Sequence, residues 1–125
     1  MRKFATALNC IDGRVQLPVI NYLKKNYNVE YVDMITAPGI NKILAKNKNS
    51  TIEMIKNCLK ISLSIHKSKL IALVGHYDCA GNPAEKKSQL NDILTAVETI
   101  DLWTFDVDVI GLWVDENWKV SLVHY

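Results

Sequence analysis

Residues Leu70 to Val74 form an uninterrupted apolar run, and this run limits the folds that the chain can adopt. A strand with one face in water alternates apolar and polar residues, whereas a strand without alternation is buried on both faces. Burial on both faces is typical of a parallel sheet that helices cover on each side. The run therefore predicts an α/β domain built around a central sheet.

Other short apolar segments predict the remaining strands of this sheet. They cover residues 4–11, 29–36, 107–114 and 119–123. The last two segments flank Asp115-Glu116-Asn117, a turn sequence that predicts a hairpin. We expect a mostly parallel central sheet flanked by helices, with an antiparallel edge strand at the C-terminus.

Segments with apolar residues at helical spacing separate the predicted strands. The first has Leu17, Ile20, Leu23 and Tyr27 on one face. A short helix is expected near residues 43–44. The segment Ser50-Thr51-Ile52-Glu53 has the pattern of a capping box and predicts the start of another helix, with Cys58 on its core-facing stripe. Residues 82–85 predict the start of the last helix, with Leu90, Ile93, Leu94 and Val97 facing inward.

Length and composition indicate one domain, residues 1–125, because the chain has no repeat and no linker. About half of the residues (49%) are hydrophobic, which suffices for a core at this length. The net charge of +2 and the scattered lysines fit solvated helix faces and give no nucleic-acid-binding patch. No apolar run approaches the ~20 residues of a membrane span, and no secretory leader precedes the first strand. We expect a cytoplasmic protein without membrane or nucleic-acid partners.

Two loops contain residues that could bind a metal: Cys10-Ile11-Asp12-Gly13-Arg14 and Gly75-His76-Tyr77-Asp78-Cys79-Ala80-Gly81. Each loop follows a predicted strand, and sites in open α/β sheets lie at the carboxyl ends of strands. Cys10, His76 and Cys79 offer two thiolates and one imidazole, which is a ligand set suited to zinc. Three protein ligands leave a fourth position for water or substrate, as in catalytic zinc sites. The loops therefore predict such a site.

Asp12 and Arg14 extend this predicted site. An arginine two residues after an aspartate at a turn can hold the carboxylate through charge-assisted hydrogen bonds. A carboxylate held in this way can orient a zinc-bound hydroxide, or it can become the fourth ligand and close the site. The alternative is a structural ion pair that only braces the turn.

The two motifs C-x-D-x-R and H-x-x-C, each after a buried strand, make the sequence resemble the β-class carbonic anhydrases. Ser62-Leu63 with residues 69–75, and the segment 110–115, resemble further parts of that family, so the resemblance runs from about residue 4 to about residue 123. It implies that Cys10, His76 and Cys79 bind Zn²⁺ and that Asp12 and Arg14 form a catalytic dyad. The implied enzyme is a zinc lyase, a carbonate dehydratase, in which zinc-bound hydroxide attacks carbon dioxide to give bicarbonate.

The sequence also departs from this family. Members are usually longer and have N-terminal helices that wrap the neighbouring subunit, whereas here the first strand starts almost at Met1. The family's Arg-Asn-Ala-Gly-Asn stretch appears as residues 36–40, Thr-Ala-Pro-Gly-Ile, and its Cys-Gly appears as Cys79-Ala80-Gly81.

Two alternatives follow from these departures: a zinc-binding domain that Asp12 closes and that has no activity, and an enzyme acting on another small electrophile such as carbon disulfide or carbonyl sulfide. A nucleic-acid-binding zinc module is disfavoured because such modules pair their ligands in two short knuckles.

The late apolar segments also bear on assembly. Trp103, Trp113 and Trp118 all lie there, where aromatic side chains fill a core or a subunit interface. A doubly wound domain this short is expected to bury surface against a second copy of itself. We therefore expect a homodimer or a higher homo-oligomer that acts on a small molecule.

Overall fold

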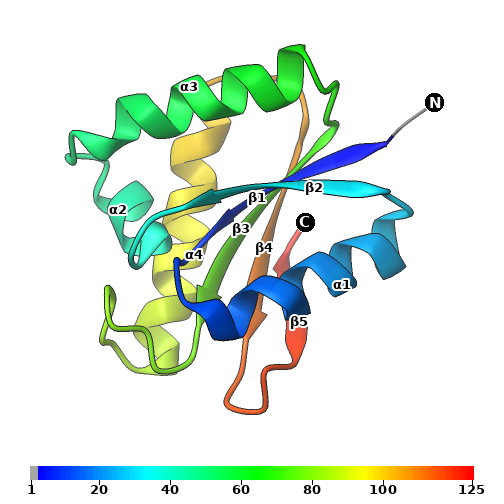
Figure 1. Ribbon diagram of the computed structural model, residues 1–125. Helices are drawn as coiled ribbons and strands as arrows, with labels where there is room; N and C mark the ends of the chain where they lie inside the picture. Colours follow the sequence, from blue (N-terminus) through cyan, green and yellow to red (C-terminus); the bar gives the residue numbers. More distant parts are fainter. Residues whose placement is uncertain (1–2) are drawn as a thin grey trace.

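The computed structural model describes residues 3–125 and places them as helices on both sides of a five-stranded sheet (Figure 1). The strands are β1 (Phe4–Asn9), β2 (Tyr31–Thr36), β3 (Leu70–His76), β4 (Asp108–Val114) and β5 (Val120–His124). Their order across the sheet is β2-β1-β3-β4-β5. The first four strands are parallel, and β5 pairs with β4 in the antiparallel direction. The predicted fold class is confirmed.

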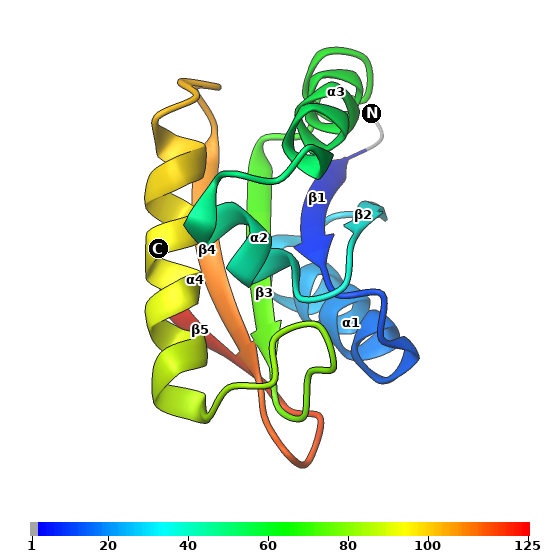
Figure 2. The same ribbon diagram turned by 90° about the vertical axis from the view of Figure 1, so that its left-hand side faces the viewer.

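The helices are α1 (Gln16–Tyr27), α2 (Ile40–Lys46), α3 (Thr51–Ser64) and α4 (Lys86–Asp101), and a 3₁₀ turn, η1 (Gly13–Val15), precedes α1. Helix α1 covers one face of the sheet, and α2, α3 and α4 cover the other (Figures 1 and 2). All seven residues of β3 are buried, since Leu70, Ala72 and Val74 pack toward α1 and Ile71 and Leu73 pack toward the other helices. Among residues 3–125, no helix is both long and apolar enough to cross a membrane.

One of two predicted helix starts is wrong in detail. Ser50 precedes α3, but its own backbone is helical and its side chain caps nothing. A capping side chain needs an extended backbone to reach back to the helix, so the adjacent Asn49 accepts a hydrogen bond from the Thr51 N–H instead, at 2.8 Å. Helix α4 begins at Lys86 with Glu85 at its N-cap, so the predicted start at residues 82–85 lies directly before it.

Three residues predicted to face the core are more exposed than expected. Leu17 and Leu94 are exposed, and Cys58 is only partly buried. In α1 the buried residues are Val19 and Leu23. Helical spacing alone fits more than one stripe of a helix, and packing decides which stripe is buried.

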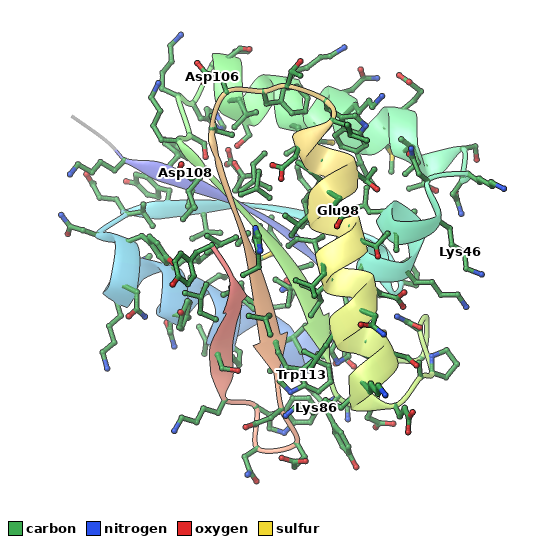
Figure 3. The ribbon with its side chains drawn as sticks, turned by 180° about the vertical axis from the view of Figure 1, so that it is seen from behind. Lys46, Lys86, Glu98, Asp106, Asp108 and Trp113 are labelled. Atoms are coloured by element: carbon green, nitrogen blue, oxygen red, sulfur yellow. The ribbon has the colours of Figure 1, made fainter. Side chains whose placement is uncertain are left out.

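The view from behind shows the two ends of β4 (Figure 3). Trp113 lies at the carboxyl end beside Lys86 at the start of α4, whose Nζ is 6.0 Å from the indole centroid. Asp106 and Asp108 lie at the opposite end of the strand. Trp113 is buried in the core, which is one of the two places, core or subunit interface, expected for the tryptophans of the late segments.

Candidate metal centre

The two predicted ligand loops meet at one edge of the sheet. Cys10 directly follows β1, and His76 is the last residue of β3. These strands are parallel neighbours, so their carboxyl ends lie side by side. One ligand atom from each of Cys10, His76 and Cys79 lies within 4.8 Å of the others, and all three side chains are buried. The structure therefore brings together three side chains that are remote in the chain and could hold a metal ion.

The separation of the two sulfur atoms tests whether this cluster suits zinc. Cys10 Sγ and Cys79 Sγ are 3.8 Å apart. A disulfide would need about 2.0 Å. A tetrahedral ion with zinc–sulfur bonds of about 2.3 Å places two of its sulfur ligands about 3.8 Å apart. The sulfur pair thus has the spacing of two corners of a zinc site.

The His76 ring presents one free nitrogen within the same cluster. Its Nδ1 lies 2.7 Å from the Tyr77 carbonyl oxygen, which can only accept, so Nδ1 carries the proton. The other nitrogen, Nε2, is buried and has no hydrogen-bond partner among the described residues. A buried polar atom without a partner is unfavourable by about 1–3 kcal/mol. Coordination of a metal by Nε2 would remove that penalty.

The electrostatics of the sulfur pair favour a cation. The pKa of Cys10 is lowered, first by the hydrogen bond from the Cys79 thiol and further by the neighbouring His76 imidazole and the Gly39 N–H, although burial opposes the shift. The same hydrogen bond raises the pKa of Cys79. Burial disfavours a charged His76, but the Cys10 sulfur, the Tyr77 carbonyl and the Asp12 carboxylate together outweigh burial and raise the pKa of His76. The cluster thus holds a thiolate in a buried position, as a metal site requires.

Gln16, the first residue of α1, fixes the loop that contains Cys10. Its Nε2 donates to the Cys10 carbonyl at 2.6 Å and to the Asp12 carbonyl at 3.1 Å. Asn9 adds a second brace, because its Nδ2 donates to the Val15 carbonyl at 3.2 Å. Sequence reasoning did not identify Gln16, whose only signal was a polar residue at the start of a helix near the motif.

Two glycines bring the loop after β2 against the loop after Cys79. A Cβ on Gly81 would lie 2.4 Å from the Pro38 carbonyl carbon, and a Cβ on Gly39 would lie 2.6 Å from the Gly81 carbonyl carbon. Gly39 also has φ +59°, which favours glycine. The contact places the Gly39 N–H 3.5 Å from Cys10 Sγ. Gly39 lies within residues 36–40 and Gly81 follows Ala80, so the two segments in which the sequence departs from the family pattern contact one another.

Asp12 and Arg14 form the expected ion pair beside the cluster. Asp12 Oδ1 accepts from the Arg14 backbone N–H at 2.9 Å and from Nε at 3.0 Å, and Oδ2 accepts from Nη2 at 2.7 Å. These hydrogen bonds lower the pKa of Asp12 to about 2. Both carboxylate oxygens are thus engaged by Arg14, and Asp12 lies outside the three-residue cluster.

Arg14 also connects Asp12 to the second ligand loop and to the β4–β5 turn, which sequence reasoning had not joined to the site. Its Nη1 and Nη2 donate to the Asp78 carboxylate and carbonyl at 3.3 and 3.1 Å. Its guanidinium carbon lies 4.5 Å from the ring centroid of Trp118, a residue of the turn between β4 and β5. Asp78 is left-handed at φ 57°, which turns the His76–Cys79 loop toward the arginine. The arginine thus holds three segments together.

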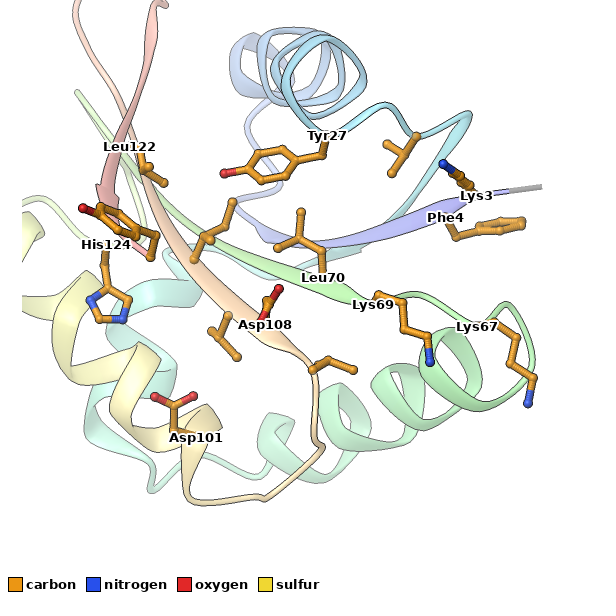
Figure 4. A pocket seen from close by; sticks show the side chains of 15 residues that line it. Lys3, Phe4, Tyr27, Lys67, Lys69, Leu70, Asp101, Asp108, Leu122 and His124 are labelled. Atoms are coloured by element: carbon orange, nitrogen blue, oxygen red, sulfur yellow. The ribbon is translucent and has the colours of Figure 1, made fainter. Parts of the chain in front are cut away.

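A large hollow in the described structure opens away from this cluster. It has a volume of about 1080 Å³ and opens at the amino ends of β3 and β4, beside the end of α1 (Figure 4). Lys3, Lys67 and Lys69 lie along one side, and Asp101 and His124 lie along the other. None of the three candidate ligands lines it. The candidate metal site is therefore identified by the chemistry of its side chains, and the volume of this hollow does not point to it.

Comparisons with known proteins are consistent with this geometry. A family profile described as "Putative carbonic anhydrase" matches residues 1–124. A search of curated proteins found no match.

Several solved structures have a similar fold. The carbonic anhydrase from Glaciozyma antarctica has a TM-score of 0.62 at 12% identity, over 94% of this chain and 80% of that one. One of two tetrameric β-carbonic anhydrases from Sordaria macrospora has a TM-score of 0.57 at 12% identity, over 98% and 81%. A β-carbonic anhydrase of Aspergillus fumigatus has a TM-score of 0.56 at 11% identity, over 97% and 76%. At these identities the likeness establishes the fold.

Proposed function

This chain belongs to the "Putative carbonic anhydrase" family, and from that premise we propose that it is a zinc-dependent lyase that interconverts carbon dioxide and bicarbonate. We propose further that residues 1–125 act as one β-carbonic-anhydrase-like domain. The observation that carries the proposal is the buried cluster of two sulfur atoms and one unpartnered imidazole nitrogen.

Cys10, His76 and Cys79 would hold the zinc ion. Bound there, zinc would act as a Lewis acid and lower the pKa of water to about 7, which supplies a nucleophile at neutral pH. The Tyr77 carbonyl keeps the proton of His76 on Nδ1 and so leaves Nε2 free to coordinate. The Gly39 N–H stabilises the negative charge on Cys10 Sγ.

Asp12 would act as the hydrogen-bond acceptor of the reaction. Its low pKa keeps the carboxylate ionised at every pH at which the enzyme would work, so it can accept but not donate. An acceptor in that position would fix the proton of the attacking water and so aim a lone pair at carbon dioxide. Arg14 positions the carboxylate through four hydrogen bonds.

We also propose that the chain assembles as a homo-oligomer. The Sordaria macrospora structure is described as a tetrameric β-carbonic anhydrase, and this chain has the same fold. Several large apolar side chains are exposed on this chain, among them Ile61, Ile65 and Leu102. Exposed apolar surface of this kind often marks a subunit interface.

Metal analysis and a carbon dioxide hydration assay test the proposal together. We expect about one zinc per chain in the native protein, loss of that zinc in Cys10→Ser, and hydration above the buffer rate at a pH above neutral. Cys58→Ser is the matched control, because Cys58 lies outside the cluster and should leave zinc content unchanged. Zinc-loaded protein that hydrates carbon dioxide no faster than buffer would contradict the proposal.

One observation supports a related enzyme as the second candidate. Residues 36–40 replace the family's Arg-Asn-Ala-Gly-Asn stretch beside the cluster, so the pocket wall differs from the family pattern. A different wall would suit another small electrophile, such as carbon disulfide or carbonyl sulfide. Rates for these compounds measured beside carbon dioxide decide between the two.

A closed zinc site without activity would instead show Asp12 bound to the metal at every pH in metal-loaded crystals.

A further inference from the structure

Three buried amide side chains are hydrogen-bonded to one another beside the candidate metal centre. Asn41 lies on α2, Gln89 lies on α4, and Asn82 lies in the loop that follows Cys79. Their exposed fractions are 1%, 0% and 3%. Helices α2 and α4 are neighbours on the same face of the sheet (Figure 2). We call Asn41, Gln89 and Asn82 the amide ring.

The hydrogen bonds of the amide ring form a closed circuit. Asn41 Nδ2 donates to Gln89 Oε1 at 2.7 Å, and Gln89 Nε2 donates to the Asn82 carbonyl at 2.6 Å. Asn82 Nδ2 completes the circuit with a longer contact of 3.4 Å to Asn41 Oδ1, and it also donates to Asp92 Oδ2 at 2.9 Å. Among residues 3–125, the buried side-chain polar atoms without a partner include none from the amide ring. The amide ring thus joins two helices to the loop after Cys79.

Asn82 connects the amide ring to the metal cluster. The hydrogen bond with Cys10 and burial raise the pKa of the Cys79 thiol, whereas the backbone N–H of Asn82 lowers it. That N–H group therefore acts directly on the ligand sulfur. The Asn82 carbonyl accepts from Gln89 and, at 2.7 Å, from the Ala84 N–H. The residue whose N–H stabilises a thiolate at Cys79 is thus the residue that the amide ring holds in place.

The amide ring also packs against the strand that ends in His76. A Cβ on Gly75 would lie 2.7 Å from Asn41 Nδ2, which is closer than a real Cβ approaches such an atom. The missing side chain at Gly75 therefore makes room for the Asn41 amide one residue before His76. The amide ring lies against both segments that supply ligands from the second loop.

The chemistry of the amide ring suits positioning better than stability. Hydrogen bonds between buried amides contribute little net free energy to folding, and apolar residues of the same shape can stabilise a core about as well. Amide hydrogen bonds are directional, however, and a fully satisfied polar network specifies one arrangement of a core. A metal site needs this precision, because its ligand distances must be held to about 0.2 Å.

We propose that Asn41, Gln89 and Asn82 are positioning residues of the metal centre. They hold the loop after Cys79 so that the Asn82 N–H faces the ligand sulfur and the sulfur keeps the spacing that a zinc ion requires. They act through Cys79. The inference rests on the zinc site proposed above and is independent of the small molecule on which the enzyme acts.

The zinc affinity of Gln89→Met tests this inference, with a chromophoric chelator as the competitor. Methionine is an unbranched side chain of similar length, but it cannot donate a hydrogen bond to the Asn82 carbonyl. We expect zinc binding to be at least about tenfold weaker than in the native protein, because loss of a supporting contact typically weakens metal binding by about 10–100-fold. Circular dichroism checks that the variant is folded.

Thr99→Val is the matched control. Thr99 is also a buried polar residue of α4, and its hydroxyl donates to the Thr95 carbonyl at 3.1 Å, outside the amide ring. A loss of stability lowers the apparent affinity only by the fraction of protein that is folded, so a folded control should bind zinc within about twofold of the native protein. If Thr99→Val weakens zinc binding as much as Gln89→Met, the effect is general destabilisation and the inference is wrong.

Cobalt(II) in place of zinc gives a readout that stability alone does not change. The sulfur-to-metal charge-transfer band of the loaded protein reports the thiolate ligands. At saturating Co²⁺ we expect this band to shift or lose intensity in Gln89→Met, because the Asn82 N–H no longer faces the Cys79 sulfur as it does in the native protein. Thr99→Val should keep the native band.

The remaining outcomes separate this inference from the proposed function. Folded Gln89→Met with native zinc affinity would refute the inference, and so would a weaker affinity with the native cobalt band. Should Gln89→Met not fold, Asn82→Ala removes the side-chain contacts to Asn41 and Asp92, and native affinity in that variant would refute the inference equally. A native protein that binds no zinc would overturn the metal site together with the inference. Zinc binding that depends on Gln89, without carbon dioxide hydration, would overturn the proposed reaction alone.

Discussion

Replacing Gly81 by alanine should push the ligand loop that contains Cys79 away from the loop after β2 and so disturb the metal cluster. The new Cβ would lie 2.4 Å from the Pro38 carbonyl carbon and 2.5 Å from the Gly39 nitrogen. Carbon atoms in contact prefer about 3.5–4.0 Å, so the loops must move apart by about 1 Å. The obstructing atoms are backbone atoms, and no flexible side chain can give way.

A movement of about 1 Å exceeds what a zinc site tolerates, because metal–ligand distances vary by only about 0.2 Å. The loop that moves contains Cys79, whose sulfur lies 3.8 Å from that of Cys10. Loss of a supporting contact typically weakens metal binding by about 10–100-fold. We therefore expect Gly81→Ala to bind zinc at least tenfold more weakly than the native protein.

Competition with a chromophoric zinc chelator measures this affinity directly. Gly13→Ala is the matched control, since Gly13 also lies in a loop of the site but a Cβ there would meet nothing within 4 Å. It should bind zinc as tightly as the native protein. If Gly81→Ala binds zinc within twofold of the native protein while remaining folded, the inferred role of the glycine contact is wrong.

Three further predictions concern the residues around the cluster. Arg14→Lys should lower the hydration rate by about tenfold or more with zinc content unchanged, because lysine cannot make the forked contact with Asp12; stopped-flow assay with metal analysis checks both. Gln16→Leu should lower the free energy of unfolding by about 1–3 kcal/mol, measured by denaturant titration, because it leaves two carbonyls without their donor. The folded-state pKa of Asp12 is lowered from 3.8 to about 2, so its stabilising effect is complete above pH 3.8 and is lost as the pH falls through about 2. Acid titration of Asp12→Asn should therefore show a shallower loss of stability over that range than the native protein, and an identical slope would contradict this.

The apolar run of residues 70–74 was enough to predict the parallel sheet, because burial on both faces leaves few other folds. The three candidate ligands could be grouped from sequence for a similar reason, since carboxyl ends of neighbouring parallel strands share one edge. In both cases a local sequence pattern is compatible with only one spatial arrangement of the residues.

Contacts between distant loops could not be predicted in this way. Residues 36–40 and residues 79–81 each departed separately from the family pattern, and only the contact between Gly39 and Gly81 shows that the two segments fit one another. The position of Trp118 under Arg14 likewise depends on where the β4–β5 turn folds. Helix faces were also ambiguous, because α3 has two apolar stripes and sequence spacing does not show which one is buried.

Cys10 and Cys79 are separated by 69 positions along the chain, yet their sulfur atoms are 3.8 Å apart. An ion bound between them would act as a reversible cross-link that joins the first strand to the middle of the chain. Closing so long a loop restricts the unfolded chain. Removal of the ion by a chelator would therefore lower the free energy of unfolding and raise the rate of unfolding. Supply of the metal would then govern how long each molecule survives as well as what it does.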